Sequence, residues 1–416
     1  MDRKDPLRKY RNRFNMIQNT IYMDGNSLGM MPKKSEFNIH RILNEWKTLG
    51  IDGWLEGEIP WFFYAEEMGK QIAPIVGAKP SEVIMTGTTT LNLHTLVNTF
   101  YNPSSEKTKI LADELNFPTD IYALKGQIRI HGLNPDNELI LVPSEDGLTL
   151  KENTIIDMIR EDVALIILPS VLYRSGQLLD LQRLTKAAHD RSIPIGFDCS
   201  HSVGAVPHKF DEWDVDFALW CGYKYLNGGP GAPAFLYVNE KHFHRTTDLL
   251  GWFGYVKEKQ FDMSLDFEKA MNAGGWQISS PGIIASGGVQ GGLEITLKAG
   301  IDQIRQKSLK LTQYLIELVD YYLKDPPYNI QIGTPRESHR RSGHIALIRE
   351  ENAYQICKAM KKHQIIPDFR PPNIIRVAPI ALYNTYHEVW QVVQTIKSII
   401  DAKEYLEFSE ERSLIS

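Results

Sequence analysis

The residue of this chain best placed to do chemistry is a lysine at the end of an apolar run. Lys224 follows the strand-like run Phe217–Cys221 and precedes the glycine-rich turn Asn227–Gly231. A lysine in this position is partly buried, and it lies beside a backbone that a ligand can approach closely. These conditions favour an amine that forms a Schiff base with a carbonyl compound. The ordinary alternative is a surface lysine that follows a strand.

A second polar cluster, Asp198–His201, follows the apolar run Ile193–Phe197. A buried carboxylate at Asp198 would hold a proton on a pyridine nitrogen and make that ring an electron sink. Asp198 could equally cap the next turn. His201 could contact a cofactor ring or its phosphate, although a lone histidine is often structural. Taken with Lys224, the cluster predicts pyridoxal phosphate as the cofactor.

Two further motifs could hold parts of such a cofactor. The run Thr86–Thr90 precedes an expected helix, so its hydroxyls and free amides could bind phosphate or form an ordinary N-cap. In Asn116–Asp120, Phe117 could stack on a flat ring, and Thr119 and Asp120 could hydrogen-bond its substituents. The alternative is a helix that begins at a proline. Neither a Walker P-loop nor a dinucleotide fingerprint is present.

Two further features are an arginine within an apolar strand and a group of cysteines and a histidine that could bind a metal. Arg376, in Ile374–Ile380, is costly to bury without a partner, which would be a substrate carboxylate or a structural ion pair. The spacing of Cys199, His201 and Cys221 matches no common zinc site, so we expect no metal.

Length and composition restrict the class of protein. A chain of 416 residues exceeds one typical core and predicts two domains. Its net charge of -5 argues against a nucleic-acid surface, and no run is long and apolar enough for a membrane span. The charged N-terminus lacks the apolar core of a signal peptide. Three cysteines without framework spacing indicate free thiols in a reducing cytoplasm.

Between residues 83 and 240, short apolar runs alternate with amphipathic stretches, which predicts an α/β fold with a largely parallel sheet covered on both faces. Ligands of such folds bind at the carboxyl ends of the strands, where Asp198, His201 and Lys224 fall. We expect strands at 109–113, 138–142, 164–168, 193–198, 217–221 and 234–238, and helices at 90–100, 118–126, 151–160 and 180–191.

The pattern changes from about residue 285. A long helical stretch, 286–324, is expected to break near Gly300 and to lead into a smaller α+β unit. The expected division is an N-terminal segment 1–45 that packs with the small domain, a large cofactor-binding domain 46–285 and a small domain 286–416. The small domain should contain strands near 329–332, 343–348 and 374–378 and helices at 351–363 and 385–402.

Taken in order, these motifs resemble the kynureninase family of fold-type I pyridoxal-phosphate enzymes, which have an aspartate-aminotransferase-like fold. The resemblance covers nearly the whole chain. The combination of the lysine motif with the Asn-Phe-Pro-Thr-Asp motif makes it specific. The motifs that carry it are Tyr22–Gly29, Asn116–Asp120, Asp198–Gly204, Tyr223–Gly231, Gly251–Gly254 and Arg376–Tyr383.

The resemblance implies a role for each matching residue. Lys224 would hold the cofactor, Tyr223 would reach its phosphate and assist proton transfer, and Asp198 would pair with the pyridinium nitrogen. Trp252 and Ser280 would reach into the site of a second subunit, which implies a homodimer with shared active sites. The other implied cofactor contacts are Thr89, Thr90, Phe117, Pro118, Thr119, Asp120 and His201, and the implied substrate contacts are Arg376, Trp54 and Ser280.

The family reaction is hydrolysis of the Cβ–Cγ bond of L-kynurenine to anthranilate and L-alanine, in tryptophan degradation and NAD biosynthesis. Animal relatives, which favour 3-hydroxykynurenine, have His and Asn where this chain has Trp54 and Ser280, so the resemblance implies plain kynurenine. The chain departs from its relatives at Leu172, where they have Asn, and at Tyr255, where many have His.

Other functions of the same fold remain open at this stage. A cysteine-desulfurase-like lyase would need a cysteine on a mobile loop. Cys357 falls in an expected helix, and Cys199 and Cys221 fall at strand ends. The further alternatives are an aminotransferase and a regulatory protein that binds the cofactor without turnover.

Overall fold

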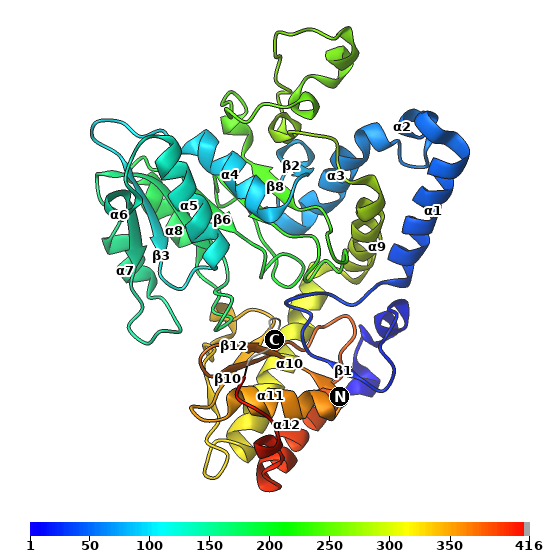
Figure 1. Cartoon of the computed structure of the whole chain (residues 1–416), viewed down its shortest axis with the longest axis vertical. Helices are drawn as coiled ribbons and strands as arrows, with labels where there is room; N and C mark the ends of the chain where they lie inside the picture. Colours follow the sequence, from blue (N-terminus) through cyan, green and yellow to red (C-terminus); the bar gives the residue numbers. More distant parts are fainter. Residues whose placement is uncertain (412–416) are drawn as a thin grey trace.

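The computed structural model describes residues 1–411, which form a larger and a smaller unit placed end to end (Figure 1). The larger unit contains a seven-stranded sheet in the order β2-β8-β7-β6-β5-β3-β4. Only β8 runs antiparallel to its neighbours. The strands are β2 (Val83–Met85), β3 (Lys109–Asp113), β4 (Leu139–Val142), β5 (Val163–Pro169), β6 (Ile195–Asp198), β7 (Phe217–Trp220) and β8 (Phe235–Val238).

Helices cover both faces of this sheet, as its continuous apolar strands require. Along β5, Leu165 and Ile167 belong to one buried cluster, whereas Ile166 and Leu168 belong to another. The helices of this unit are α1 (Lys33–Leu49), α2 (Gly53–Glu56), α3 (Tyr64–Val76), α4 (Thr89–Phe100), α5 (Pro118–Ile130), α6 (Pro135–Glu138), α7 (Glu152–Asp157), α8 (Leu181–His189) and α9 (Ile283–Ala299). No helix within residues 1–411 combines the length and apolar character needed to cross a membrane.

The six strands predicted for this region are confirmed to within two residues at each end. The seventh, β2, was not predicted because three residues are too short to show a periodicity. The four helices predicted between the strands are present as α4, α5, α7 and α8. The α/β class and the parallel sheet therefore follow from the sequence pattern.

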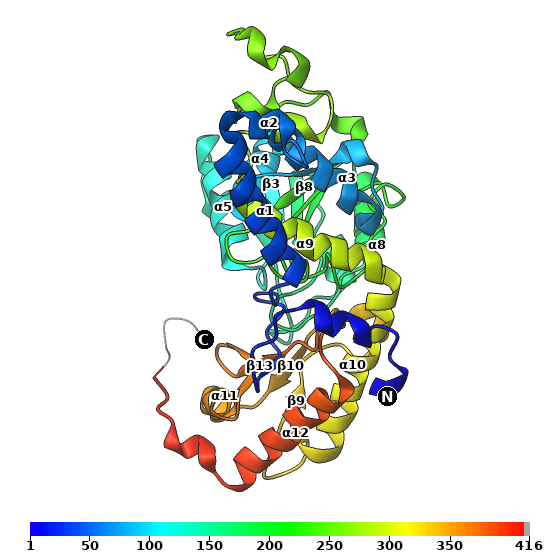
Figure 2. The ribbon, with the colours of Figure 1, turned by 90° about the vertical axis from the view of Figure 1, so that its right-hand side faces the viewer.

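The smaller unit has a four-stranded antiparallel sheet, in the order β12-β13-β10-β9, packed on three helices (Figure 2). A separate short strand near the N-terminus, β1, pairs in parallel with β11. The elements are β1 (Ile21–Tyr22), β9 (Gln331–Ile332), β10 (Ile345–Ile348), β11 (Ile365–Ile366), β12 (Asp368–Arg370), β13 (Ile374–Val377), α10 (Ile301–Tyr322), α11 (Ala353–Lys362) and α12 (Tyr386–Asp401).

The long helix breaks at Gly300, as predicted, because that residue has a positive φ of 78°. The unit boundary differs from the predicted 285/286, since Val289 and Leu293 of α9 lie in the core of the larger unit. Glycines let α9 pack tightly on α1. A Cβ at Gly291 would lie 2.2 Å from the backbone nitrogen of Ser35.

The N-terminal segment also differs from its predicted extent of 1–45. Residues before α1 contact the smaller unit, where Asp5 pairs with Lys307 at 2.7 Å and Arg11 with Glu388 at 2.7 Å. In contrast, α1 packs on α9 of the larger unit. The segment that belongs with the smaller unit therefore ends before Lys33.

An arm without strands, drawn in lime green, projects from the far end of the larger unit (Figure 1). It connects β8 to α9 and exposes several large apolar side chains. Phe261 is 70% exposed, Met263 is 70% exposed and Leu265 is fully exposed. Apolar side chains gathered on one projection indicate a contact surface.

Candidate active site

Lys224 lies in the turn that follows β7, at the carboxyl edge of the sheet. Its Nζ is 3.0 Å from Nε2 of His201, in the turn that follows β6. The same nitrogen is 6.0 Å from the ring centre of Phe117 and 5.9 Å from that of Tyr223. The fold thus brings together four residues that the sequence placed on three different loops.

The imidazole of His201 is buried and neutral. Burial lowers its pKa well below the ordinary value, and the positive charges of Lys224 and Arg376 lower it further. A neutral imidazole has one nitrogen that accepts a hydrogen bond, so Nε2 can accept from the Lys224 ammonium. His201 can therefore hold the lysine amine in place through this hydrogen bond.

Three aspartates gather beside this lysine. Asp120 is fully buried, and among residues 1–411 its carboxyl accepts no hydrogen bond from an N–H or a hydroxyl, although the carboxyl of Asp198 lies close enough to share a proton with it. Burial raises its pKa well above the ordinary value, and the carboxylates of Asp198 and Asp113 raise it further. Burial also raises the pKa of Asp113 to about 7. Uncompensated acids at this point favour a cationic ligand, such as a protonated pyridine nitrogen.

Asp198 itself ends β6, and its Oδ1 accepts a hydrogen bond of 2.7 Å from the backbone nitrogen of Ser200. The turn-capping role considered for this residue is therefore present, and Oδ2 is left for a ligand. Asp113 was not among the predicted site residues. Its position at the end of a predicted strand, three residues before the Asn116 motif, is a signal that could have revealed it.

The N-termini of α4 and α5 lie side by side at the same edge. The hydroxyls of Thr90 and Thr119 are 2.9 Å apart and join the first turns of the two helices. Thr88, the N-cap of α4, gives no side-chain cap, so first-turn amides are free to bind an anion such as phosphate. Thr89 and Pro118 are the first residues of the two helices.

Phe117 presents a ring that a flat ligand could cover. The side chain is 42% exposed although it lies between buried strands, and its ring meets Tyr173 edge to face at 5.2 Å. Its distance from Lys224 matches the space that a stacked pyridine ring would need. The lysine, the carboxyls, the open ring and the helix N-termini together fit pyridoxal phosphate.

Tyr223 precedes the lysine and is half-buried. Burial raises the pKa of its phenol, and the neighbouring Cys221 thiol and Asp198 carboxylate act in the same direction. The phenol therefore keeps its proton at neutral pH and can donate a hydrogen bond.

Arg376 enters the site from β13 of the smaller unit and is almost fully buried. Its guanidinium forms an ion pair with Asp368 and donates to the backbone oxygen of Tyr173 at 2.7 Å and to Ser27 Oγ at 3.0 Å. The structural ion pair that the sequence left open is thus present. The remaining N–H can meet a carboxylate, and Ser27 is a partner that a carboxylate could displace.

The segment Tyr22–Gly29 runs between the two units. Ser27 contacts Arg376, and the backbone nitrogen of Gly29 donates to the carbonyl of Tyr223 at 2.8 Å. A Cβ at Gly29 would lie 2.4 Å from the carbonyl oxygen of Lys224, so only glycine fits there. One segment therefore contacts both the lysine turn and the arginine.

The structure does not bring Trp54, Trp252 and Ser280 to this pocket. Trp54 packs on Trp61 and Phe253, at ring-centre distances of 6.0 and 6.2 Å. Trp252 is 50% exposed and lies at the base of the arm, and Ser280 is exposed. Within one subunit, Trp252 and Ser280 are exposed and Trp54 is half-buried against Trp61 and Phe253.

The two departures from the family pattern also lie outside the pocket. Leu172 is buried and belongs to a core cluster of the larger unit. Tyr255 is buried against Phe267 of the arm at 5.9 Å, edge to face. Neither side chain replaces a group that touches Lys224.

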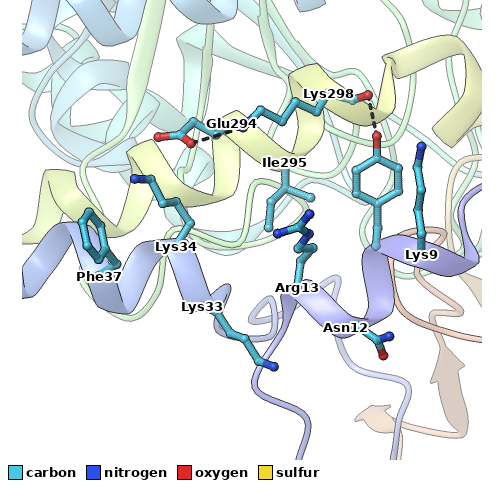
Figure 3. Close-up of a pocket in the computed structure, with 10 residues that line it drawn as sticks. Lys9, Asn12, Arg13, Lys33, Lys34, Phe37, Glu294, Ile295 and Lys298 are labelled. Atoms are coloured by element: carbon cyan, nitrogen blue, oxygen red, sulfur yellow. Dashed lines mark hydrogen bonds and ion pairs between the residues drawn. The ribbon is translucent and has the colours of Figure 1, made fainter.

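A cavity of about 970 Å³ lies elsewhere, between the N-terminal segment and helices α1 and α9 (Figure 3). Basic side chains such as Arg13, Lys33 and Lys34 line it, but they are exposed or half-exposed. The cavity is a solvated groove and contains none of the site residues above. Within residues 1–411, no group of three His, Cys, Asp or Glu side chains is arranged to hold a metal ion.

The sheet order, the lysine after β7 and the buried carboxyls define a fold-type I pyridoxal-phosphate enzyme. Solved structures agree on the fold. A cysteine desulfurase from Thermococcus onnurineus superimposes with a TM-score of 0.80 at 18% identity, over 95% of this chain and 98% of the other. The cystine C-S lyase C-DES superimposes with a TM-score of 0.78 at 14% identity, over 91% and 98%.

Sequence comparison assigns the family within that class. Residues 304–396 match the kynureninase C-terminal domain. Kynureninase from Geobacillus thermodenitrificans is 55% identical over 416 residues, which is all of this chain and 96% of that protein. Kynureninase from Bacillus thuringiensis is 52% identical over 415 residues, with the same coverage. The chain belongs to the kynureninase family.

Proposed function

We propose that this protein hydrolyses L-kynurenine to anthranilate and L-alanine with pyridoxal phosphate as cofactor, in tryptophan degradation and NAD biosynthesis. The observation that carries the proposal is the pocket of Lys224, in which an amine lies near the open ring of Phe117 and near the buried carboxyl of Asp120. When bound, the cofactor supplies an electron sink for cleavage of a carbon–carbon bond.

The residues of the pocket would hold the cofactor at its two ends and on one face. Asp198 and Asp120 would take the pyridine nitrogen, because a cation there favours the ionised form of Asp120, which burial and neighbouring carboxylates otherwise disfavour. Phe117 would cover the ring. Thr89, Thr90, Thr119 and the free amides of α4 would take the phosphate, with Pro118 next to them at the start of α5.

Proton movements would fall to Lys224 and Tyr223. We assign to Lys224 the transfer of a proton from the substrate α-carbon, because His201 holds its amine in place at 3.0 Å. Tyr223 would donate a proton or a hydrogen bond, because its raised pKa keeps the phenol neutral.

Arg376 would bind the substrate α-carboxylate. Asp368 holds its guanidinium from behind, and the Tyr173 carbonyl fixes its orientation. A carboxylate would then take the free N–H and compete with the Ser27 hydroxyl. A replacement Arg376→Lys should raise KM more than it lowers kcat, because lysine cannot reproduce the planar fork.

We also propose that the active unit is a homodimer that completes each site with residues of the other subunit. The support is the position of Trp54, Trp252 and Ser280 away from the pocket of their own subunit, and an apolar groove of about 700 Å³ that includes Trp46, Trp54 and Trp61. Exposed apolar surface of this kind favours a second protein surface.

A complementation experiment tests the shared site. Lys224→Ala and Trp252→Ala each damage a different half of a shared site, so each pure variant should be weakly active. Equal mixing after subunit exchange should restore about a quarter of the parent activity, since half the dimers are mixed and each has one intact site. Activity no greater than the sum of the two variants would contradict a shared site.

Within the substrate class, plain kynurenine is the proposed preference. The bulky Trp54 and the small hydroxyl of Ser280 would line the aryl end of a site completed across the dimer. Trp54→His with Ser280→Asn should shift the ratio of kcat/KM values toward 3-hydroxykynurenine. An unchanged ratio would rule out this role for the pair.

The direct test of the function uses purified protein loaded with pyridoxal phosphate. Addition of L-kynurenine should give fluorescent anthranilate, and borohydride should bleach the absorption band of the lysine-bound cofactor. Lys298→Ala, an exposed lysine whose ion partner is Glu294, is the matched control and should behave as the parent. A bleachable band without anthranilate would reject the substrate and keep the cofactor.

A desulfurase function, which the fold also permits, is not favoured by the cysteines. Cys199, Cys221 and Cys357 are all buried and free. Burial raises the pKa of Cys199 to about 12, and it also raises that of Cys357, so neither thiol is poised to attack sulfur. Buried free thiols also support our proposal that the protein works in the reducing cytoplasm.

A further inference from the structure

A second histidine lies behind the lysine's partner, and none of the roles above uses it. His344 directly precedes β10 of the smaller unit and is fully buried. Its ring centre is 5.8 Å from that of His201, with the planes tilted by 58°. Neither of its ring nitrogens, nor Nδ1 of His201, has a hydrogen-bond partner of good geometry among residues 1–411. Three unpaired nitrogens at one point are costly and require an explanation.

The charged groups that act most strongly on this pair are positive. Burial lowers the pKa of His344 well below its ordinary value, with Arg376, Lys224 and Arg370 acting in the same direction. The Tyr173 backbone opposes them in part. His201 faces the same three cations and His344 itself. Both imidazoles are therefore neutral at neutral pH, and each has one N–H donor and one acceptor nitrogen.

The lysine decides which nitrogen of His201 carries the proton. Nε2 accepts from the Lys224 ammonium, so the hydrogen must be on Nδ1, where it needs an acceptor. In His344, Nε2 lies against the turn that holds Gly176, where a Cβ would be 3.2 Å from it. The same turn contains the Tyr173 backbone, which raises the His344 pKa as an acceptor of its N–H would. Nδ1 of His344 is then the acceptor.

We propose that His344 is a positioning residue of the active site, which accepts the Nδ1 proton of His201, directly or through one buried water, and thereby holds His201 in the tautomer that binds Lys224. The chain of contacts begins in the smaller unit and ends at the lysine. Ser342, two residues before His344, also donates to the backbone oxygen of His201 at 3.0 Å. The smaller unit thus orients His201 through both its backbone and its ring.

The alternative is that His344 only fills space under the turn of Gly176. That turn is close, because Gly176 has a φ of 74° and a Cβ there would lie 2.7 Å from the His344 backbone oxygen. A filler could be replaced by any side chain of similar length. A positioning residue could be replaced only by one that accepts a hydrogen bond.

Gln and Met separate these roles, because they have similar lengths and only Gln can hydrogen-bond. The inference rests on the proposed function, since the readout is the absorption band of the lysine-bound cofactor titrated against pH. His344→Met should shift the midpoint of this pH titration by about 0.5–1 pH unit, which corresponds to the free energy of one lost hydrogen bond. It should also slow cofactor loading onto the cofactor-free protein. His344→Gln should keep the parent midpoint, and KM for kynurenine should change less than twofold in both.

Equal midpoints for the Gln and Met variants would overturn the inference. If the Met variant does not fold, His344→Leu takes its place, alone and combined with His201→Gln. The inference expects the midpoint shift of His344→Leu to disappear in the His201→Gln background, and additive shifts would overturn it. A parent protein without any lysine-linked band would instead reject the proposed function, so the two failures are distinguishable.

Discussion

Buried aspartates lie at both ends of the strands of the seven-stranded sheet, and their surroundings shift their pKa values in opposite directions. At the amino end of β7, Asp216 accepts from His189 and His242 at 2.8 and 2.7 Å and from the backbone nitrogen of Ile195 at 2.9 Å. These bonds lower its pKa despite burial. At the carboxyl edge, the carboxyl of Asp120 accepts no hydrogen bond from an N–H or a hydroxyl of residues 1–411, and its pKa is raised.

The difference separates a structural carboxylate from a ligand-binding one. Asp216 has every partner it needs within the chain, so it contributes to stability and has nothing left to bind. Asp120 has a raised pKa that a bound cation would lower. Unsatisfied acids at the carboxyl ends of the strands, including one in the first turn of α5, are therefore a better mark of a site than acids as such. The four predictions below test this contrast.

The largest effect should come from the lysine at the carboxyl edge. Lys224→Ala should lower anthranilate formation by about 10³-fold or more, because the proton-transfer group and the cofactor anchor are lost together. The thermal midpoint of the cofactor-free protein should stay within a few degrees, since the side chain is only half-buried. Steady-state kinetics and calorimetry give the two values. A variant that keeps a tenth of the parent rate would refute the assignment.

A change at the amino ends of the strands should lower stability and leave activity nearly unchanged. Asp216→Ala removes the shared partner of two histidines and of Lys241, and it should lower the free energy of unfolding by about 3 kcal/mol. Urea denaturation measures this loss. Activity per folded molecule should remain within about twofold, because no site residue contacts Asp216. A loss of kcat in the folded fraction well beyond twofold would show that Asp216 is not purely structural.

Asp120→Asn should show the reverse pattern at a smaller scale. The amide resembles the protonated acid, so the free energy of unfolding at pH 7 should change by less than about 1 kcal/mol. Activity should fall by about 10- to 100-fold, the value of a charge-assisted hydrogen bond to a cofactor nitrogen. Asp216→Asn is the matched control and should lose stability instead. Equal stability losses in the two Asn variants would argue that both aspartates are structural.

The smallest effect is a pH dependence of the cofactor-free protein. The pKa of Asp113 is about 7 in the folded chain and near 4 when unfolded. Between these values the unfolded state binds fewer protons, so Asp113 makes stability fall as pH rises from about 4 to 7. Asp113→Asn should remove roughly 1–2 kcal/mol of that fall. The free energy of unfolding is measured at pH 5 and at pH 8. If the difference between the two values is the same in parent and variant, this role of Asp113 is excluded.

Local pattern accounts for most of the fold and for part of the site. The break at Gly300 and the buried strands leave clear sequence signals, because a positive φ favours glycine and a covered sheet needs continuous apolar runs. The site depends on contacts between distant segments. Asp113 and His344 acquire their environments only when β3 and β10 are placed beside the lysine turn, and a single sequence does not encode that placement locally.

The misplaced unit boundary has the same origin. The helical pattern predicts a boundary at 285/286, whereas the glycines of α9, such as Gly291, let that helix pack on α1 of the larger unit. Trp54, Trp252 and Ser280 lie away from the pocket of their own chain. The resemblance implies that Trp252 and Ser280 reach the site of a second subunit, and the proposed homodimer keeps that role for them.

The segment Tyr22–Gly29 has a mechanical consequence. It is fastened to the smaller unit by the pairing of β1 with β11 and to the larger unit by the bond from Gly29 to Tyr223. A rotation of one unit against the other must change the conformation of this short segment or break one of these contacts. The distance between Lys224 and Arg376 therefore depends on this main-chain segment as well as on side chains. Slow hydrogen exchange of the Gly29 amide would show that its bond to Tyr223 persists in solution.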